Sequence, residues 1–458
     1  MESSFLEKLY SALSTFDDWL WGNWLLFVLI GVGVLYTAIT GGVQIRCFGY
    51  VMRDYVFKPL KNKKHDSAEK GTITSFQALC TALASCVGSG NIVGVSTAVL
   101  AGGMGALFWM WVAAFVGMAT KFGEIVLGML YRRKNDAGEY VGGPFYYIEK
   151  GLHAPLLATL TALFMVIQII GGNFIQSNTI SGILRSTFNI PELYTGIALV
   201  VLIFVIAIGG LKRLAHTAQR MVPVMAVLYI FSGLIIIIVN IKTLPAVIAS
   251  IFKGAFSLQA AAGGAAGTVM RVAMQKGVAR GLYSNEAGEG SAPVLHSAAS
   301  VQHPVQQGLT GIAEVFFDTF VLCTMSGLII GVTGMLNSGH GAPVLVAEAF
   351  ATLWEPMRYL VIISLLLFCT STLMSQWYFG FVGLNYIFGF KTADSFKYIF
   401  PLFCVIGATM KLELVWVIQD IALGFLTIPN LLAMIFLFPQ VHRSTVEFFK
   451  SGLYQPGK

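Results

Sequence analysis

The chain has 458 residues, of which 56% are hydrophobic and only 11% are charged, and its formal net charge is +7. A typical soluble domain carries roughly 25% charged residues, so this composition excludes an ordinary soluble enzyme or binding module and indicates a polytopic membrane protein. The basic residues gather at the ends of apolar runs, so the positive charge is a signal of membrane topology and does not indicate nucleic-acid binding.

Recurrent apolar runs predict the secondary structure of most of the chain. Each run holds about 20 residues, enough for one helix to cross a hydrocarbon core about 30 Å thick. We expect eleven transmembrane helices, near residues 22–42, 75–100, 105–131, 154–183, 193–211, 218–241, 259–285, 308–334, 357–388, 396–410 and 412–438. The expected fold class is an all-α polytopic membrane protein in which residues 1–458 form a single integral domain. The short segment 342–352 predicts an amphipathic helix in an external loop.

The distribution of Lys and Arg predicts the orientation of the chain. These residues are frequent in one set of short loops, such as 46–70 and 132–150, and rare in the opposite set. Cytoplasmic loops carry the excess of basic residues. We therefore expect a multi-pass protein of the cell membrane (plasma or inner membrane) with its N-terminus outside and its C-terminus in the cytoplasm.

The second predicted span is interrupted by a polar, glycine-rich stretch, Val87-Gly88-Ser89-Gly90-Asn91. Helix interiors usually avoid this composition, since each Gly costs about 1 kcal/mol relative to Ala. Close packing of helices through small residues is one explanation. Local unwinding explains more of the pattern, because it frees main-chain groups at mid-membrane depth, where they are tolerated only if they line a cavity.

A break of this kind offers two sorts of main-chain group to a ligand. The half-helix that starts near Asn91 presents free N–H groups and the positive end of its dipole, which suit a carboxylate. The carbonyl groups that end the preceding half-helix, around Ala84 to Val87, suit a cation. We therefore expect a small zwitterion and a metal ion to bind side by side at this break.

The fourth predicted span is unusually polar for a membrane helix. In the segment MVIQIIGGNFIQSNTI, the residues Gln168, Gly172 and Gln176 share one helical face, and Phe174 lies close enough in sequence to cap a small ligand. Either these amides hold helices together or one of them binds substrate. Buried polar groups in membranes are candidate functional groups, and Gln176 is our preferred candidate.

A second glycine-rich interruption lies in the seventh predicted span. Its glycines are Gly263, Gly264, Gly267, Gly277, Gly281, Gly288 and Gly290. Interrupted spans at matching places in two halves are typical of transporters built from inverted repeats. Five spans per half would invert residues 259–438 relative to residues 75–241 and leave residues 22–42 as an extra N-terminal helix.

The charged residues inside the predicted spans need partners. Lys276 lies at the centre of the second interruption, and it could extend to the membrane surface, pair with a carboxylate of the eighth span or contact the substrate; the sequence leaves these three open. Structural pairs are expected for the others: Lys121 with Glu124, and Glu314 and Asp318 with a basic group of the seventh span such as Arg280.

The ninth predicted span supplies hydroxyl groups for a cation. A hard monovalent cation takes several oxygen ligands, and Thr370, Ser371 and Thr372 follow one another in an otherwise apolar helix. The alternative is that these hydroxyls donate to carbonyl groups one turn earlier, which is common in membrane helices. Their place as the third span of the second repeat favours the cation.

Three segments resemble signature segments of a known family. FQALCTALASCVGSGNIVGV, GGPFYYIEKGL and GVARGLYSNEAGEGSAP are similar to the signatures of the alanine/glycine:cation symporters, and the resemblance covers nearly the whole chain. That family is similar in fold to the LeuT-type transporters, which implies a five-plus-five inverted repeat. It also implies sodium-driven uptake of small amino acids such as alanine and glycine. We expect no enzymatic activity, because no metal-binding or nucleophile motif appears, and no organic cofactor. The expected partners besides the substrate are membrane lipids, and the chain can be a monomer.

The resemblance also implies which residues form the site. Sodium would bind the carbonyl groups of Ala84 and Val87 and the hydroxyls of Ser371 and Thr372. The substrate-binding residues would be Ser89, Gly90 and Asn91 at the first break, Phe174 and Gln176 on the fourth span, and Lys276, Gly277 and Val278 at the second break.

Two departures from the family pattern concern specificity. Lys276 stands where an uncharged side chain is usual. Directly after Thr372, where the family usually continues with a glycine, aromatic residues and an acid, the segment here reads LMSQWYFG. A glutamine-type substrate therefore stays open. Proton coupling is a further alternative, although the sixth span lacks the lysine that replaces the cation in proton-coupled relatives. A channel or a sensor is disfavoured, because the chain has no soluble sensory module.

Overall fold

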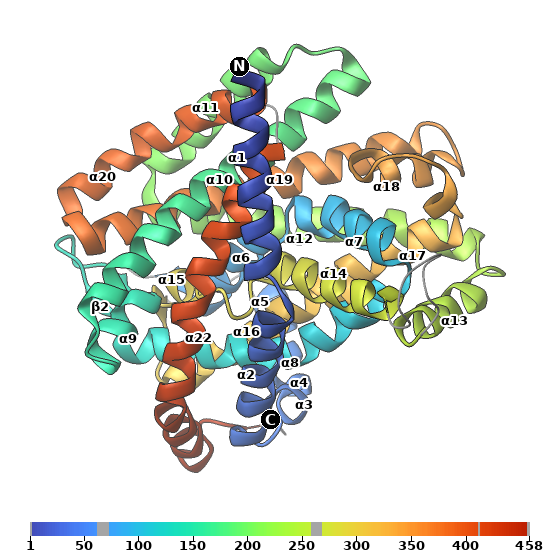
Figure 1. Ribbon diagram of the computed structural model, residues 1–458. Coiled ribbons are helices and arrows are strands. Elements are labelled where there is room, and N and C mark those ends of the chain that lie inside the picture. Colours follow the sequence, from blue (N-terminus) through green and yellow to red (C-terminus); the bar gives the residue numbers. More distant parts are fainter. Residues whose placement is uncertain (1, 62–72, 258–267, 411–412, 456–458) are drawn as a thin grey trace.

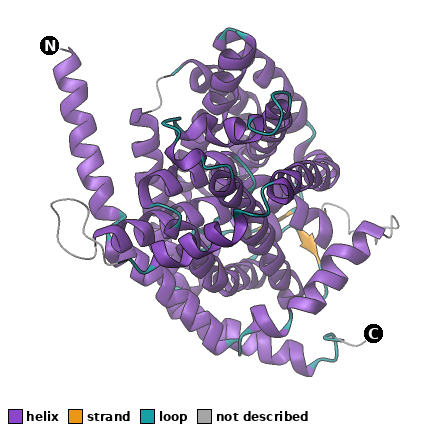
Figure 2. Ribbon diagram, turned by 90° about the vertical axis from the view of Figure 1, so that its right-hand side faces the viewer, coloured by secondary structure: helices purple, strands orange, loops and turns teal. Residues whose placement is uncertain are grey.

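The computed structural model describes residues 2–61, 73–257, 268–410 and 413–455. Within these ranges the regular secondary structure is helical apart from two pairs of two-residue strands, and loops and turns connect the elements (Figures 1 and 2). The long or functionally placed helices are α1 (Glu2–Leu20), α2 (Asn23–Ile39), α6 (Ser75–Cys86), α7 (Val95–Gly102), α8 (Gly105–Tyr131), α10 (Pro155–Phe188), α11 (Glu192–Ile208), α12 (Gly210–Val239), α13 (Leu244–Ala255), α14 (Thr268–Asn285), α16 (Pro304–Val315), α17 (Thr324–Val332), α19 (Met357–Phe388), α20 (Phe390–Ile399), α21 (Phe403–Thr409) and α22 (Glu413–Lys450). The all-α prediction is confirmed.

Shorter elements connect these helices. They are α3 (Val43–Arg46), α4 (Phe48–Val51), η1 (Met52–Phe57), α5 (Lys58–Lys61), η2 (Gly90–Gly94), α9 (Pro144–Gly151), α15 (Ala292–His296), η3 (Phe316–Cys323), η4 (Met335–Asn337), α18 (Ala342–Ala351) and η5 (Phe400–Leu402), with the strands β1 (Ile73–Thr74), β2 (Arg133–Lys134), β3 (Tyr140–Val141) and β4 (Ala299–Ser300). The helix expected in the external loop is α18, which packs against η2 and α19.

The number of membrane-crossing helices differs from the sequence-based count. Seven helices of the described ranges are long and apolar enough to cross a membrane, or eight if α6 and α7 are taken as one bent span. The helices α11 and α21 fall short because they hold 17 and 7 residues. The eleven spans expected from composition therefore stay a prediction, while the multi-pass architecture is clear.

The first interruption is a break in the helix, as the sequence predicts. A capping box begins α6, in which Thr74 accepts from the Gln77 N–H and the Gln77 side chain accepts from the Thr74 N–H. The helix ends at Cys86, Val87 is extended with ψ 94°, and the chain resumes as a π-helical turn, η2. The two halves are bent by 52° relative to one another.

The second break lies later in the chain than the sequence-based prediction placed it. Helix α14 runs without interruption through Lys276, Gly277 and Val278, and the chain leaves the helix only at Glu286, whose φ is +55°. Gly288 and Gly290 follow with φ of +96° and +90°, a conformation that favours glycine. The break is therefore the segment 286–291, before α15 begins. Gly263, Gly264 and Gly267 lie outside the described residues.

The two broken helices lie side by side. Strand β1, directly before α6, pairs in parallel with β4, which follows α15, through Ile73 with Ala299 and Thr74 with Ser300. Farther along, η2 contacts α14, and α15 contacts α6. The start of the first broken helix is thus tied to the end of the second, which brings both breaks into the interior of the molecule.

A layer of long helices supports the breaks. Helix α19 packs against α6, α10 and α12, and α10 also packs against α22. The helix expected at residues 22–42 is α2, and it is preceded by α1, which runs alongside α22 (Figure 1) and projects beyond the rest of the molecule (Figure 2). The inverted relation of residues 75–241 and 259–438 stays a prediction.

Candidate functional site

The main chain between α6 and η2 is buried and closely surrounded. A Cβ atom on Gly88 would lie 2.5 Å from Thr372 Oγ1 and 3.1 Å from Gln176 Nε2, so only glycine fits there without moving those groups. A Cβ atom on Gly90 would lie 3.3 Å from the Tyr283 ring. The hydroxyl of Ser89 is buried and has no hydrogen-bond partner among the described residues. The hydroxyl of Ser89 therefore lies unpaired within a tight enclosure.

The end of α6 meets two hydroxyl groups of α19. Val87 O accepts hydrogen bonds from Ser371 Oγ at 3.4 Å and from Thr372 Oγ1 at 3.3 Å. Both hydroxyls also lie within bonding distance of Phe368 O, at 2.8 and 3.1 Å, so the alternative of bonding one turn back along the helix holds as well. The structure thus brings together three of the four groups predicted to bind a cation.

The fourth predicted ligand, Ala84, loses its usual helical partner. The Gly88 N–H would continue α6 by donating to Ala84 O, but it donates instead to Asn91 Oδ1 at 2.9 Å. The helix therefore ends with its last carbonyl groups available to other donors or to a cation. The sequence analysis missed Ser375, one turn after Ser371, whose hydroxyl donates to Thr81 O of α6 at 3.3 Å.

Amide side chains from two helices flank the break. Gln176 Oε1 of α10 accepts from the Ser89 N–H at 3.2 Å. Gln376 of α19 lies against Gly172, and its Oε1 is buried with no hydrogen-bond partner among the described residues. The sequence analysis missed Gln376, although its spacing of four from Thr372 places it on the same helical face.

The other polar residues of α10 hold helices together. Asn178 Nδ2 donates to Gly407 O at 3.0 Å and to Met410 O at 2.7 Å, so it fastens α10 to α21. The Phe174 ring packs edge-on against Phe403, with centroids 5.9 Å apart. Since Phe174 is two residues from Gln176, it points to the other side of α10, and the expectation that it caps the break is wrong for this arrangement.

Asn91 connects the two breaks. Its Nδ2 donates to Asp318 Oδ1 at 2.6 Å, and the same carboxylate oxygen accepts from Ser284 Oγ at 2.9 Å. Ser326 Oγ donates to Asn91 O at 2.6 Å. Asn91 is therefore engaged with α14, η3 and α17, and its side chain fixes the geometry of the breaks. Asp318 does not pair with Arg280, which corrects the pairing expected from sequence.

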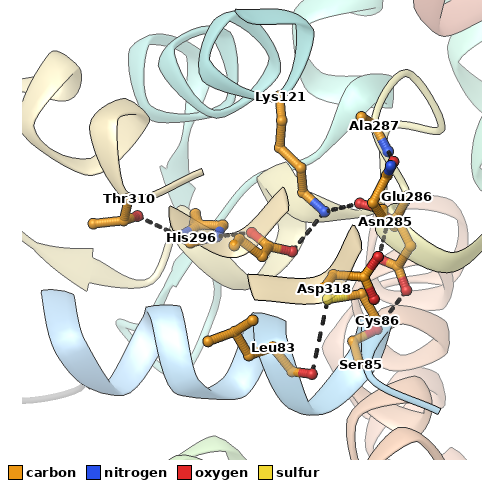
Figure 3. A network of polar contacts seen from close by, with 12 residues as sticks. Leu83, Ser85, Cys86, Lys121, Asn285, Glu286, Ala287, His296, Thr310 and Asp318 are labelled. Atoms are coloured by element: carbon orange, nitrogen blue, oxygen red, sulfur yellow. Dashed lines mark hydrogen bonds and ion pairs between the residues drawn. The ribbon is translucent and has the colours of Figure 1, made fainter. Parts of the chain in front are cut away.

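Charged residues of the second break are buried and bonded to one another (Figure 3). Lys121 Nζ of α8 lies 2.5 Å from Glu314 Oε1 and donates to Asn285 O, the end of α14, at 2.6 Å. Glu314 Oε2 lies 3.0 Å from His296 Nε2 of α15. This network therefore fixes both sides of the second break to α8 and α16. The expected pair of Lys121 with Glu124 is wrong, because Glu124 is bonded by Asn430 of α22.

The carboxylate of Glu286 also joins the two breaks, through contacts other than those of Asn91. Glu286 Oε1 accepts from Ser85 Oγ of α6 at 2.8 Å (Figure 3). Glu286 Oε2 accepts from Ser291 Oγ at 2.6 Å. The hydroxyls satisfy this buried carboxylate without a formal ion pair among the described residues. The first and second breaks are thus linked by Asn91 on one side and by Glu286 on the other.

The three residues predicted at the second break lie away from Ser89. Lys276 lines a cavity of about 50 Å³ with Asp17, Asp18 and Asp420. Gly277 lets α14 approach the Ala106 carbonyl group of α8 closely, and Val278 is buried against α2 and α8. The structure therefore disfavours two of the three possibilities for Lys276: pairing with a carboxylate of the eighth predicted span, and contact with a substrate at the break.

A cluster of aromatic and charged residues separates that cavity from the break. Arg280 lies 3.6 Å from Asp420, and its guanidinium lies 5.4 Å from the Trp416 ring and 5.8 Å from the Tyr283 ring. Tyr283 is the residue whose ring lies against Gly90. The path from the cavity at Lys276 to the break is therefore closed by Tyr283 and by the pair of Arg280 and Asp420.

Comparisons with known proteins agree with this architecture. The model of the sodium:alanine symporter family matches residues 6–454. The chain is 41% identical over 445 residues to an uncharacterised transporter of Haemophilus influenzae, covering 96% of each chain. It is 38% identical over 448 residues to the sodium/alanine symporter AgcS of Methanococcus maripaludis (96% of this chain, 97% of that one) and 35% identical over 438 residues to the probable sodium/glutamine symporter GlnT of Bacillus subtilis (93% and 87%).

Solved structures share the fold at low sequence identity. MhsT in complex with L-phenylalanine matches with a TM-score of 0.56 and 14% identity, covering 81% of this chain and 90% of that one. A Na⁺-coupled sialic acid symporter matches with a TM-score of 0.55 and 12% identity, covering 85% and 82%. The fold is that of the LeuT-type transporters, and these relatives and neighbours are transporters and not enzymes, as the sequence predicts.

Proposed function

The chain belongs to the sodium:alanine symporter family, and we propose that it is a secondary active symporter that couples inward movement of sodium to uptake of a small neutral amino acid of the alanine or glycine type. The observation that carries this proposal is the meeting of Val87 O with the hydroxyls of Ser371 and Thr372, directly beside the buried polar main chain at Gly88 and Ser89. A cation and a zwitterion would then be neighbours.

The choice of sodium rests on the chemistry of the ligands. Val87 O, Ser371 Oγ and Thr372 Oγ1 are neutral oxygen atoms, which replace the hydration shell of a hard cation. With a cation present, both hydroxyls would turn their lone pairs toward it and donate to Phe368 O, a bond that is already within reach. No titratable side chain takes part in this set, so a proton has no group here that could carry it.

The substrate would bind through the main chain and the amides. Its carboxylate would meet the N–H groups that begin η2 and the hydroxyl of Ser89, where the helix dipole favours negative charge. Gly88 and Gly90 keep the enclosure tight, since a Cβ atom at either position would approach Thr372 or Tyr283. Such an enclosure suits a small side chain, and Lys276, Gly277, Val278 and Phe174 take no part in it.

Glutamine is the second candidate substrate. Gln376 Oε1 is buried without a partner among the described residues and Gln176 lies close by, so two amides could bond the carboxamide of a bound glutamine. Leaving a buried carbonyl oxygen unpaired costs about 1–3 kcal/mol, which a carboxamide N–H would recover. The relative GlnT is named as a probable sodium/glutamine symporter.

Transport would proceed by alternating access. Sodium between α6 and α19 would hold these helices together, and the substrate would complete the site under Tyr283. Coupling needs only that each ligand binds the outward and inward states with unequal affinity, and linkage makes the effect reciprocal. Separation of Arg280 from Asp420 would open the path on the side of Lys276. Under the proposed orientation this side faces outward, with the N-terminus outside and the C-terminus in the cytoplasm.

Uptake into proteoliposomes tests the proposal. The purified chain would be given radiolabelled alanine with an inward sodium gradient, with unlabelled glycine and glutamine as competitors. Sodium-driven accumulation is expected, and it should vanish when choline replaces sodium. Accumulation driven by a pH gradient in sodium-free buffer would instead establish proton coupling, and facilitated flux without accumulation would indicate a channel.

A further inference from the structure

An apolar cavity of about 220 Å³ lies behind the first half-helix. Its walls come from α6, α12, the end of η1 with α5, and η3, and every lining residue is apolar. Its lining includes Phe76, Leu79, Leu83, Ala226, Ile230 and Phe317. A cavity of this composition does not hold water, because water needs two to four polar partners.

The mouth of this cavity is also apolar. Val227 on α12 is 66% exposed, and Phe57 and Leu60 on the opposite wall are 53% and 46% exposed. Because the chain crosses the membrane, exposed apolar side chains of this kind face hydrocarbon. The cavity therefore opens toward lipid, and an empty space there would forfeit the dispersion contacts that a hydrocarbon chain supplies.

Basic residues stand at one end of the cavity. Lys58 and Lys61 lie on α5 beside Phe57 and Leu60. Arg220 lies on α12, three residues before Pro223, and lines a neighbouring cavity with Met221. Among the residues that the structure describes here, Asp54 is the acidic neighbour, and it is 2.6 Å from Arg53 and farther, 3.5 Å, from Lys58. This end therefore keeps an excess of positive charge, which attracts anionic lipid headgroups at a membrane surface.

The opposite end of the cavity reaches the break. Val87 lines it, and Leu79, Leu83 and Val87 lie four residues apart on one face of α6 and its end. The other face of α6 carries Ser85, which bonds to Glu286. The cavity thus extends from a charged surface to the middle of the chain's membrane-crossing part, the depth of one leaflet, along the back of the half-helix that ends in the candidate cation site.

We infer that this cavity binds one acyl chain of an anionic phospholipid, with its headgroup at Lys58, Lys61 and Arg220 and its hydrocarbon packed against Leu79 and Leu83 of α6. The acyl chain fills the space into which α6 would otherwise be free to tilt. Its binding requires neither sodium nor substrate, so it is measured independently of transport.

Photocrosslinking in proteoliposomes tests this site. The full chain is reconstituted into phosphatidylethanolamine with a trace of phosphatidylglycerol that carries a diazirine on its acyl chain, and labelled peptides are mapped by mass spectrometry. Labelling of Leu79, Leu83 and Ile230 is expected. Labelling confined to residues on the lipid-facing surface, such as Ile197 and Val201 of α11, would overturn the inference, because those side chains are exposed to bulk lipid.

Matched variants distinguish lipid bound in the cavity from lipid in general contact with the protein surface. Ala226→Phe fills the cavity and should abolish labelling of Leu79 and Leu83, whereas Ala198→Phe, on the exposed face of α11, should leave it unchanged. Unchanged labelling in folded, monodisperse Ala226→Phe protein would contradict the site. Lys58→Gln and Arg220→Gln should each lower the labelling by the phosphatidylglycerol probe about five-fold. Equal labelling by a phosphatidylcholine or free fatty-acid probe would contradict the anionic headgroup.

Discussion

The carbonyl oxygen of Val87 and the hydroxyl of Ser371 lie 3.4 Å apart, although 284 residues separate them in the chain. Val87 directly follows the half-helix α6, and Ser371 lies in the middle of α19, so this contact joins the broken helix to the supporting layer. Thr372 approaches the same carbonyl oxygen. The candidate cation site therefore spans two elements, and under the proposed function a bound cation would oppose their separation.

Ser371→Ala should weaken the sodium dependence of uptake. The substitution removes one oxygen ligand and leaves the helix intact, and a polar contact to a charged group is worth about 1.5–3 kcal/mol. We expect the sodium concentration for half-maximal uptake to rise at least about ten-fold in proteoliposomes. Ser364→Ala is the control, since Ser364 lies on the same helix and its hydroxyl donates only to Leu360 O. Equal sodium dependence in the two variants would remove Ser371 from the site.

Gly88→Ala tests the tight approach at the break. The added Cβ atom would lie 2.5 Å from Thr372 Oγ1 and would push that hydroxyl away from Val87 O. We expect uptake to fall at least about ten-fold, as for the loss of a cation ligand. Gly94→Ala is the matched control, because a Cβ atom there would meet no described atom within 4 Å. If Gly88→Ala transports as well as Gly94→Ala, the break is wider in the working protein than we propose.

The first break was predictable because its signal is local. Three glycines with a serine and an asparagine inside an apolar run have no favourable place in a continuous membrane helix, and the structure ends α6 at Cys86. The contact with Ser371 and Thr372 was predictable only through the resemblance to a known family. Spacing alone left bonding to Phe368 O equally open, and both bonds are present.

The second break could not be located from glycine content. Gly277 and Gly281 lie inside α14, where they allow close approach to Ala106 and Met110 of α8, whereas Gly288 and Gly290 adopt positive φ. Composition is the same in the two cases, because packing and unwinding both need a residue without a side chain. The partner of Lys121 was missed for a related reason: Glu124 is near in sequence, but Glu314 is near in space.

Gln376→Leu distinguishes the two candidate substrates. The unpaired Oε1 of Gln376 would bond the carboxamide of glutamine but has no such role for alanine. We expect glutamine to compete about ten-fold less well against labelled alanine, while alanine uptake itself changes little. Gln168→Leu, on α10 two turns before Gln176, should leave both unchanged. An equal loss of glutamine competition and of alanine uptake would show that Gln376 supports the fold of the site and does not recognise the side chain of the substrate.

Lys121→Met should destabilise the protein strongly. Lys121 and Glu314 are both fully buried, and removal of Lys121 leaves the Glu314 carboxylate inside the molecule with His296 as its remaining partner. Breaking a buried pair in this way costs about 3–5 kcal/mol. Arg185→Gln is the control, because the pair of Arg185 and Glu192 is exposed and such pairs contribute about 0–1 kcal/mol. Thermal unfolding in detergent should show a large loss for Lys121→Met and almost none for Arg185→Gln. The double variant Lys121→Met, Glu314→Gln should recover part of the loss, because it removes the charge of the Glu314 carboxylate. If the double variant is as unstable as Lys121→Met, the second break is held by the bond from Lys121 to Asn285 O and not by the ion pair.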